Sequence, residues 1–207
     1  MTDASSIVAI DAARLDEAVA VLESAFTDYP VFTFVLPPRT EDRDAKLTAV
    51  MRYYAMRRLS RGWPAFALQV SGAFRAIILA NPPRHAPVPA EVLAMEEALI
   101  ETLGADAEAR RRRYETQSDL GEPGVPHFFV GMLAVHPDSR GRGYAKRLLE
   151  HVHTLSLADP DSGGVALATE SADNLPLYRH LGYRVRAEAD VGPLHTWALW
   201  RPQVHAD

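Results

Sequence analysis

The apolar positions of this chain switch repeatedly between helical spacing, three or four residues apart, and the continuous or alternating runs that are typical of strands. Clusters of Gly and Pro separate these stretches and predict where the elements end. Ser71-Gly72 lies between two strand-like runs and fits a two-residue hairpin turn. The expected helices are residues 15–26, after a possible N-cap at Asp11, 40–58, 90–103, 105–118 and 144–158, and the expected strands are residues 65–70, 73–80, 128–135, 165–169, 183–188 and 195–201.

Residues 127 to 149, HFFVGMLAVHPDSRGRGYAKRLL, join three of these elements without a gap. Phe128 to Val135 is an apolar run of strand length that we expect to be buried on both faces. A helix with one apolar face begins at Tyr144, and Arg140-Gly141-Arg142-Gly143 lies between them. Glycines let backbone N–H groups turn toward one point, and the first turn of a helix leaves four such groups unpaired. The segment therefore predicts a site for a phosphate or a pyrophosphate.

The two common phosphate-binding motifs do not fit this turn. A Walker loop needs Gly-Lys followed by Ser or Thr, but Tyr144-Ala145 follows Gly143. A dinucleotide fingerprint needs a small residue where Lys146 stands. What remains from Arg140 to Ala145 is Arg-x-x-Gly-x-Ala, which resembles the corresponding turn of the GNAT superfamily of acetyl-CoA-dependent N-acetyltransferases. A plain tight connection between a strand and a helix is the alternative for this turn alone.

A second group of residues strengthens the resemblance. Asn174, Tyr178 and the pair Gly182-Tyr183 follow the predicted strand over residues 165–169, in the order and at the distance that the superfamily shows. Tyr178 taken alone is more typical of an ordinary core residue. The two motifs together favour a member of the superfamily.

The resemblance covers nearly the whole chain and implies one domain over residues 1–207. The implied fold is α/β (α+β), with a central mixed, mostly antiparallel, twisted sheet and helices on both faces. Residues 25–30, 127–129, 174–178 and 192–197 resemble the puromycin N-acetyltransferase-like branch, whose members act on small amines.

The same resemblance implies roles for individual residues. The backbone of the strand at Leu133, Ala134 and Val135 would bind the pantetheine arm of acetyl-CoA as an added strand would. Tyr178 matches the position of the acid that protonates the leaving thiolate, with a packing role beside the cofactor as the alternative. The residues expected to hold the rest of the cofactor are Arg140, Gly141, Arg142, Gly143, Tyr144, Ala145 and Lys146, at the pyrophosphate, and Asn174, farther along.

The general base is where this sequence departs from the pattern. Many relatives have a Glu two residues before the position of Leu133, and this chain has Gly131 there. Glu170 and His127 are candidates that would reach the amine through water, although a surface Glu and a loop-capping His are equally good interpretations. The base stays unassigned, and so does the acceptor.

Composition and charge limit the alternatives. The chain has 207 residues, 47% of them hydrophobic, which is enough for one sizeable core. It has no cysteine, which excludes disulfides, thiolate metal sites and a cysteine nucleophile, and Ser139 lacks the context of a nucleophile elbow, so we expect direct acyl transfer. The N-terminus, Met1 to Ala4, has no features of a signal peptide, and no long apolar segment follows, which favours a cytoplasmic protein without membrane contact.

The remaining charged residues suggest no other class of partner. A net charge of −5 argues against nucleic acid, and the run Arg110 to Arg113 is interpreted as a solvated helix face because acids flank it. His151 and His153 point to different faces of a helix, and His85, His195 and His205 have no partner at ligand spacing, so no metal is expected.

Two functions remain open from the sequence. The first is an acetyl-CoA-dependent N-acetyltransferase that acts on a primary amine of a small molecule or peptide, as a monomer or homodimer. The second is a non-catalytic acyl-CoA-binding or regulatory protein with the same fold, which Gly131 would permit.

Overall fold

The computed structural model describes residues 5–84, 87–118, 120 and 123–203. The sequence features at Met1 to Ala4, His85, Gly121 and His205 lie outside these residues. In chain order the elements are β1 (Ser5–Ala9), η1 (Ala12–Arg14), α1 (Leu15–Phe26), α2 (Pro30–Val35), α3 (Arg43–Leu59), β2 (Ala65–Val70), β3 (Ala73–Asn81), α4 (Ala90–Leu103), α5 (Ala105–Gln117), β4 (Phe128–Val135), η2 (Pro137–Ser139), α6 (Tyr144–Ala158), β5 (Gly164–Thr169), η3 (Ala172–Asn174), α7 (Leu175–His180), β6 (Arg184–Val191) and β7 (Leu194–Pro202).

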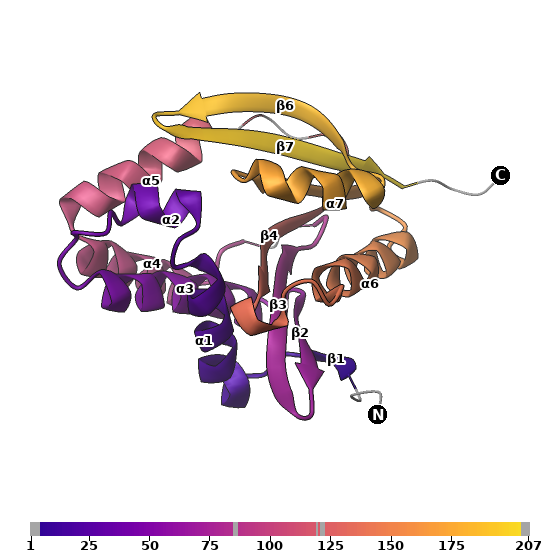
Figure 1. Ribbon diagram of the computed structural model, residues 1–207, viewed down its shortest axis with the longest axis horizontal. Helices are drawn as coiled ribbons and strands as arrows, with labels where there is room; N and C mark the ends of the chain where they lie inside the picture. Colours follow the sequence, from indigo (N-terminus) through magenta and orange to yellow (C-terminus); the bar gives the residue numbers. More distant parts are fainter. Residues whose placement is uncertain (1–4, 85–86, 119, 121–122, 204–207) are drawn as a thin grey trace.

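The described strands form one seven-stranded sheet in the order β1-β2-β3-β4-β5-β7-β6. Neighbouring strands run antiparallel except for β4 and β5, which are parallel. The sheet is strongly twisted. In Figure 1, β6 and β7 run nearly horizontally, whereas β2, β3 and β4 run nearly vertically. This confirms the mixed, mostly antiparallel, twisted sheet that the sequence resemblance implied.

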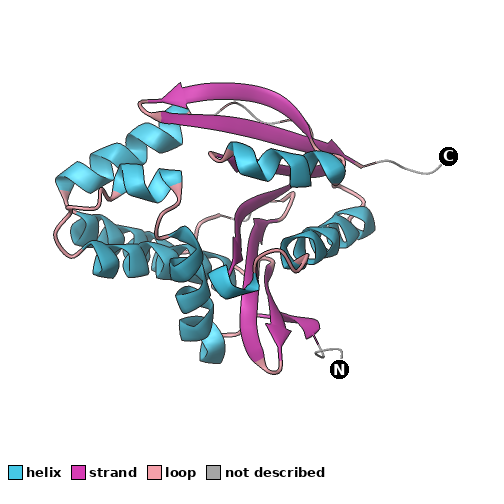
Figure 2. Cartoon of the chain, viewed as in Figure 1, coloured by secondary structure: helices cyan, strands magenta, loops and turns pink. Residues whose placement is uncertain are grey.

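Helices cover both faces of the sheet, and each face has its own core (Figures 1 and 2). Strand β3 serves both cores because its side chains alternate between the two faces. Ile77 and Leu79 pack with the core formed by helices α1 to α5, whereas Ile78 packs with the core that includes Leu148 and Leu149 of α6. The two layers of helices thus hold the centre of the sheet rigidly from both sides.

Most predicted elements are confirmed, several with the expected bounds. The strands β2 and β4 and the helix α4 match the predicted ranges. The hairpin turn between β2 and β3 is also confirmed, because Ser71 and Gly72 both have positive φ, at 51° and 84°, as a type I′ turn requires. Asp11 does act as an N-cap, but for the short turn η1, where its carboxylate accepts from the backbone N–H of Arg14 at 3.0 Å.

Strand β1 and helix α2 are among the short elements that the sequence pattern did not predict. Strand β1 pairs with β2 at the edge of the sheet, from Ser5 opposite Val70 to Ala9 opposite Phe66. Five residues with two serines give too little apolar periodicity to predict a strand. Helix α2 was missed because five of its six residues are apolar and the segment is too short to show a helical period, but Pro30 at its first position is a favourable helix start.

The expectation that β4 is buried on both faces is wrong. Its residues alternate between buried and partly exposed, and Gly131 is exposed. Val130 pairs with Ala80 and Met132 pairs with Leu79, so Gly131 is an extra residue in a β-bulge. The bulge reverses the faces to which the side chains of β4 point, because Val130 packs on the α6 side of the sheet and Met132 packs on the α1 side.

No helix among the described residues is long and apolar enough to cross a membrane.

Candidate functional site

Strands β4 and β5 separate partway along their length. They pair only where Phe128 to Val130 lie beside Val165 to Leu167. Beyond Val130, β4 keeps its hydrogen-bonded neighbour β3, with Leu133 opposite Ile78 and Val135 opposite Ala76. Its other edge has no strand partner within the described residues, and free backbone groups at such an edge can pair with an extended ligand.

The glycine-rich turn follows the free end of β4 and starts α6. Gly141 and Gly143 have φ of 75° and 76°, in the left-handed region that glycine adopts most easily, and a Cβ on either would meet no atom within 4 Å. Among the described residues, the N–H groups of residues 141 to 146 make no well-formed backbone hydrogen bond; the next one, of Arg147, donates to Gly143 O at 3.1 Å. The predicted anion site is therefore open and lined with unpaired donors.

The charges around this turn also favour an anion. Helix α6 has fifteen residues and no acid in its first turn, where acids often neutralise the helix dipole. Arg140 and Arg142 are exposed, and neither forms an ion pair within the described part of the chain. Lys146 lies 3.7 Å from Glu150, and Arg147 donates to Ser5 Oγ at 2.7 Å, so Arg147 is already engaged with the first strand.

A cavity of about 970 Å³ begins where β4 and β5 separate. Residues of α2, α3 and α5 also line it, so the side chains come from both halves of the chain. Of the predicted site residues, the cavity brings together Leu133, Asn174 and Tyr178. The turn over residues 140–146 is not part of its lining, and the side chain of Ala134 is buried on the α1 side of the sheet. Strand β4 connects the two parts of the predicted site.

Tyr178 of α7 is 6% exposed and lies at the boundary of cavity and core. Its ring packs edge-on against Tyr183, with centroids 5.9 Å apart. Within the described residues its hydroxyl makes no hydrogen bond. Burial, and next the charge of Glu170, raise the pKa of Tyr178 above its usual value, so the phenol stays protonated at neutral pH. Tyr178 therefore fits both interpretations, because its ring packs in the core while the residue also lines the cavity.

Glu170, at the end of β5, is the acid in a network of hydroxyl groups that the sequence did not reveal. Its Oε1 accepts hydrogen bonds from Tyr114 Oη at 2.7 Å and from Thr196 Oγ1 at 2.8 Å. Its backbone N–H donates to Tyr29 Oη at 3.1 Å. Burial, followed by the charge of Glu170, raises the pKa of both tyrosines. These donors fix the carboxylate at the wall of the cavity.

Asn174 is joined to the same network through Thr169. The Asn174 amide donates to Thr169 Oγ1 at 3.0 Å, and that hydroxyl lies 3.0 Å from Tyr29 Oη. One amide hydrogen of Asn174 is thus engaged within the protein, and its second amide hydrogen and its carbonyl oxygen are left for a ligand.

His127 lines the cavity at the start of β4. Its Nδ1 lies 2.7 Å from Val125 O, and its ring packs edge-on against Trp200 at 5.6 Å. Because a carbonyl oxygen only accepts hydrogen bonds, Nδ1 carries the proton and Nε2 has the free lone pair. The expected loop-capping role is confirmed by this contact, although Nε2 stays available as a proton acceptor.

Arg58 is a cavity residue that the sequence did not single out. It comes from the last turn of α3 and is 5% exposed. A Cβ on Gly131 would overlap its Nη2, so the guanidinium fills the space that a side chain at this position would need. Burial lowers the pKa of Arg58 to about 10, which still leaves it charged at neutral pH.

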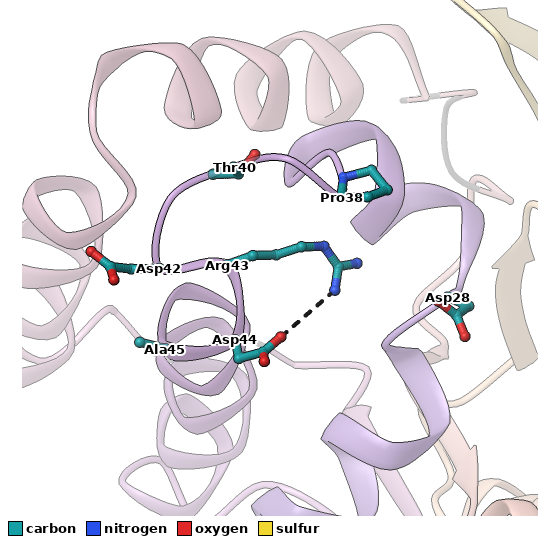
Figure 3. A pocket seen from close by; sticks show the side chains of 7 residues that line it. All are labelled: Asp28, Pro38, Thr40, Asp42, Arg43, Asp44 and Ala45. Atoms are coloured by element: carbon teal, nitrogen blue, oxygen red, sulfur yellow. Dashed lines mark ion pairs between the residues drawn. The ribbon is translucent and has the colours of Figure 1, made fainter.

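A second, open hollow lies where the loop after α2 meets α3 (Figure 3). Its central group is Arg43, which donates to Leu36 O at 2.8 Å and to Thr27 O at 2.5 Å, and lies 4.0 Å from Asp44. These bonds satisfy the arginine and tie the loop to the ends of two helices. The central group of the hollow therefore has a structural role.

The interpretation of Arg110 to Arg113 as a solvated face is wrong for Arg111. Its side chain is buried and lies 2.6 Å from both Glu108 and Glu115. Acids of the neighbouring turns are thus used to neutralise a buried arginine, which helical spacing alone does not distinguish from a surface pair.

The histidines of α6 do point to different faces, as predicted. His151 packs edge-on against Phe66, and His153 Nε2 lies 2.9 Å from Tyr183 Oη. In the ranges that the structure describes, no group of three or more His, Asp or Glu side chains is placed to hold a metal ion.

Comparisons with known proteins agree with this geometry. Residues 102–185 match the family model of the acetyltransferase (GNAT) domain, a segment that includes β4, the glycine-rich turn, α6, β5 and α7. A similar solved structure is described as histone acetyltransferase HPA2 and related acetyltransferase from Corynebacterium glutamicum, with a TM-score of 0.71, 18% identity and 98% of each chain covered.

Two further structures are described by their reactions on small amines. The polyamine N-acetyltransferase of Drosophila melanogaster, which forms N-acetylagmatine, has a TM-score of 0.67 and 19% identity, with 95% of this chain and 98% of that chain covered. Arylalkylamine N-acetyltransferase 2 of Aedes aegypti has a TM-score of 0.65 and 15% identity, with 95% and 97% covered. At these identities the likeness shows the fold, over nearly the full length of all three chains.

Proposed function

We propose that this chain, an acetyltransferase that carries a GNAT domain, transfers an acetyl group from acetyl-CoA to a primary amine of a small molecule or peptide. The observation that carries the proposal is the free edge of β4, which leads from the cavity to the unpaired N–H groups of residues 141 to 146. An extended arm with a pyrophosphate at one end and a reactive group at the other matches both features.

The residues proposed to hold acetyl-CoA follow from this match. The backbone of Leu133, Ala134 and Val135 pairs with the pantetheine arm, and Asn174 meets the cofactor farther along through its side-chain carbonyl. The open space above Gly141 and Gly143 lets phosphate oxygens approach the backbone closely. The pyrophosphate is bound by Gly141, Arg142, Gly143, Tyr144, Ala145 and Lys146, with Arg140 at the start of the turn.

Two groups are proposed to lower the barrier to transfer. The backbone N–H near Leu133 faces the thioester oxygen, where negative charge grows as the amine attacks, and donors of this kind contribute roughly 3 kcal/mol in other enzymes. Tyr178 donates its hydroxyl proton toward the leaving sulfur. Because a thiol like that of cysteine has a pKa of about 8.5, below that of a buried phenol, hydrogen bonding stabilises the thiolate first and complete proton transfer is a late event.

Glu170 is the proposed partner of the acceptor amine. Both of its hydroxyl donors bind Oε1, and no donor reaches Oε2 within the described residues, so the second oxygen is available to the amine or to a water beside it. His127 is the alternative proton acceptor through Nε2. Both face the cavity from the ends of the two separating strands.

A charge-neutralising substitution distinguishes these acceptors. Glu170→Gln keeps an oxygen for Tyr114 and Thr196 but removes the negative charge, and we expect kcat/KM for the amine to fall by roughly 10²-fold or more. Glu188→Gln, on the exposed strand β6, is the matched control and should retain full activity. Normal turnover in Glu170→Gln, with loss in His127→Asn, would transfer the role to His127.

The proposed acceptor class is a small amine. Aromatic side chains of α1 and α2 line the cavity, among them Phe26, Tyr29 and Phe32. The resemblance of residues 25–30 and 192–197 to the puromycin N-acetyltransferase-like branch points to the same class. Two structures of similar fold are described as polyamine and arylalkylamine acetyltransferases, and the cavity lining and the sequence resemblance favour the same class.

A further inference from the structure

Arg58 is a buried cation with no anionic partner among the described residues. Its Nη1 donates to Tyr54 O at 3.0 Å, whereas its Nε is buried and has no acceptor. No carboxylate of the described residues lies within ion-pair distance of its guanidinium. A buried arginine normally has a carboxylate beside it, since removing an unpaired charge from water is costly.

The other buried arginine of the cavity shows what is missing. Arg111 has Glu108 and Glu115 at 2.6 Å and Glu96 at 3.6 Å. Both arginines line the same cavity, so their difference lies in the partners that the protein provides and not in the depth of the site.

The position of Arg58 explains how a ligand would reach it. Its guanidinium packs against Gly131, the exposed bulge residue of β4. It fills the space that a side chain at position 131 would occupy. Because residue 131 is glycine, the Arg58 guanidinium can lie beside the point where β4 and β5 separate. Its N–H groups face a cavity that also holds Glu170 on β5, so the site has a positive and a negative wall.

We infer that the acceptor amine carries a carboxylate, and that Arg58 binds this carboxylate beside Gly131 while Glu170 attracts the amino group. The inference rests on the proposed acetyl transfer and names the acceptor class as amino acids. A guanidinium offers two parallel donors that match a carboxylate, and desolvation by the cavity strengthens this pairing. Substrate binding thus supplies an anionic partner that the described residues do not provide.

Matched acceptors test the inference. The rate of CoA release is measured with the series from glycine to 6-aminohexanoate and with aromatic amino acids, each beside its carboxamide, which lacks only the negative charge. The wild-type protein should prefer the best carboxylate over its carboxamide by roughly 30-fold or more in kcat/KM, as expected for a desolvated charge pair. Phosphoethanolamine is tested as an additional acceptor, because it carries a phosphate in place of a carboxylate. A preference for it over every carboxylate would overturn the carboxylate assignment.

Three variants test whether the preference for a carboxylate acceptor over its carboxamide depends on Arg58. Arg58→Gln should lower kcat/KM for each carboxylate to the level of its carboxamide and so abolish the discrimination. Arg52→Gln removes the same charge from an exposed position of the same helix, where it pairs with Asp16, and should keep the discrimination. Gly131→Ala retains Arg58 but pushes Nη2 from its place, so it should weaken the preference even if Arg58→Gln fails to fold.

The outcomes separate this inference from the function on which it rests. Turnover of neutral amines without a preference for carboxylates would overturn the inference and leave the acetyltransferase proposal standing. If no acceptor is acetylated, calorimetric binding of the same pairs to the CoA-bound protein decides the inference. A carboxylate-specific affinity that Arg58→Gln abolishes supports it, and equal binding of acid and amide overturns it.

Discussion

At the scale of single residues, two neighbouring tyrosines with different surroundings separate structure from chemistry. Tyr183 is buried and its hydroxyl lies 2.9 Å from His153 Nε2. Tyr178 packs against it edge-on, but its hydroxyl has no hydrogen-bond partner among the described residues and belongs to the cavity lining. The Tyr178 oxygen is not among the fully buried polar atoms that lack a partner, so its hydroxyl is open to the cavity and can bind a ligand there.

Tyr178→Phe should lower kcat for acetyl transfer by roughly 100-fold with little change in the affinity for acetyl-CoA, because only the proton donor is removed. Since the hydroxyl makes no hydrogen bond in the protein, the melting temperature should not fall. Steady-state kinetics and thermal unfolding measure both effects.

Tyr183→Phe is the control for this substitution. It removes a hydroxyl that does have a partner, so it should cost about 1 kcal/mol of stability and leave kcat unchanged. The opposite pattern, with full activity in Tyr178→Phe, would remove Tyr178 from the mechanism.

Sequence alone could propose Tyr178 and Asn174 as site residues, because each lies within a local motif, and both line the cavity. It could not identify the partners of Glu170, since Tyr114 is 56 positions away and its helix is otherwise dominated by charges. Arg58 was equally hidden. Its role depends on the absence of a partner in three dimensions, which no spacing along the chain expresses.

At the scale of elements, the turn and helix from Arg140 to Ala158 combine an open anion site with a buried helix face. Gly143 is the residue before the helix and has φ of 76°, while Leu148 and Leu149 are fully buried against the sheet. The sequence predicted this unit well because its glycines, charges and apolar stripe are all local. The bulge at Gly131 was not predicted, since a bulge depends on the register with β3.

Gly143→Val should abolish CoA binding while the protein remains folded. The branched side chain would occupy the open space above the turn and strain a backbone with positive φ, at a cost of roughly 1–3 kcal/mol in stability. Isothermal titration with CoA measures the affinity.

Gly72→Val controls for the strain, because Gly72 has φ of 84° and equally open surroundings in the β2–β3 turn. It should lose similar stability and bind CoA normally. Unchanged CoA affinity in folded Gly143→Val would contradict the proposed pyrophosphate site.

His153 of α6 should make stability depend on pH. Burial, and next the charge of Arg201, lower its pKa from 6.5 to about 4. Between these values the unfolded chain binds a proton that the folded protein does not, so the free energy of unfolding should fall by roughly 2–3 kcal/mol as the pH drops from 6.5 to 4. Denaturant unfolding across this range should show a flatter pH dependence in His153→Gln than in the wild-type protein, and equal slopes would show that His153 does not contribute.

At the scale of the whole molecule, the site arises where the two halves of the sheet separate. Helices α1, α2, α3 and α5 with strands β3 and β4 provide one wall of the cavity, and β5, β6, β7 and α7 provide the other. The sequence could predict the sheet and could propose a cofactor side, since both follow from local patterns and a resemblance. It could not predict the acceptor side, because helix α2 was missed and the cavity forms between segments far apart along the chain.

The central claim is that this fold transfers acetyl groups to amines, and the rate of CoA release from acetyl-CoA in the presence of primary amines tests it most directly. A panel of amino acids, polyamines and arylalkylamines, with product identified by mass spectrometry, should show release that depends on at least one amine and that falls roughly 100-fold in Tyr178→Phe. Tight binding of acetyl-CoA without amine-dependent release for any member of the panel would contradict the claim and favour a non-catalytic acyl-CoA-binding protein.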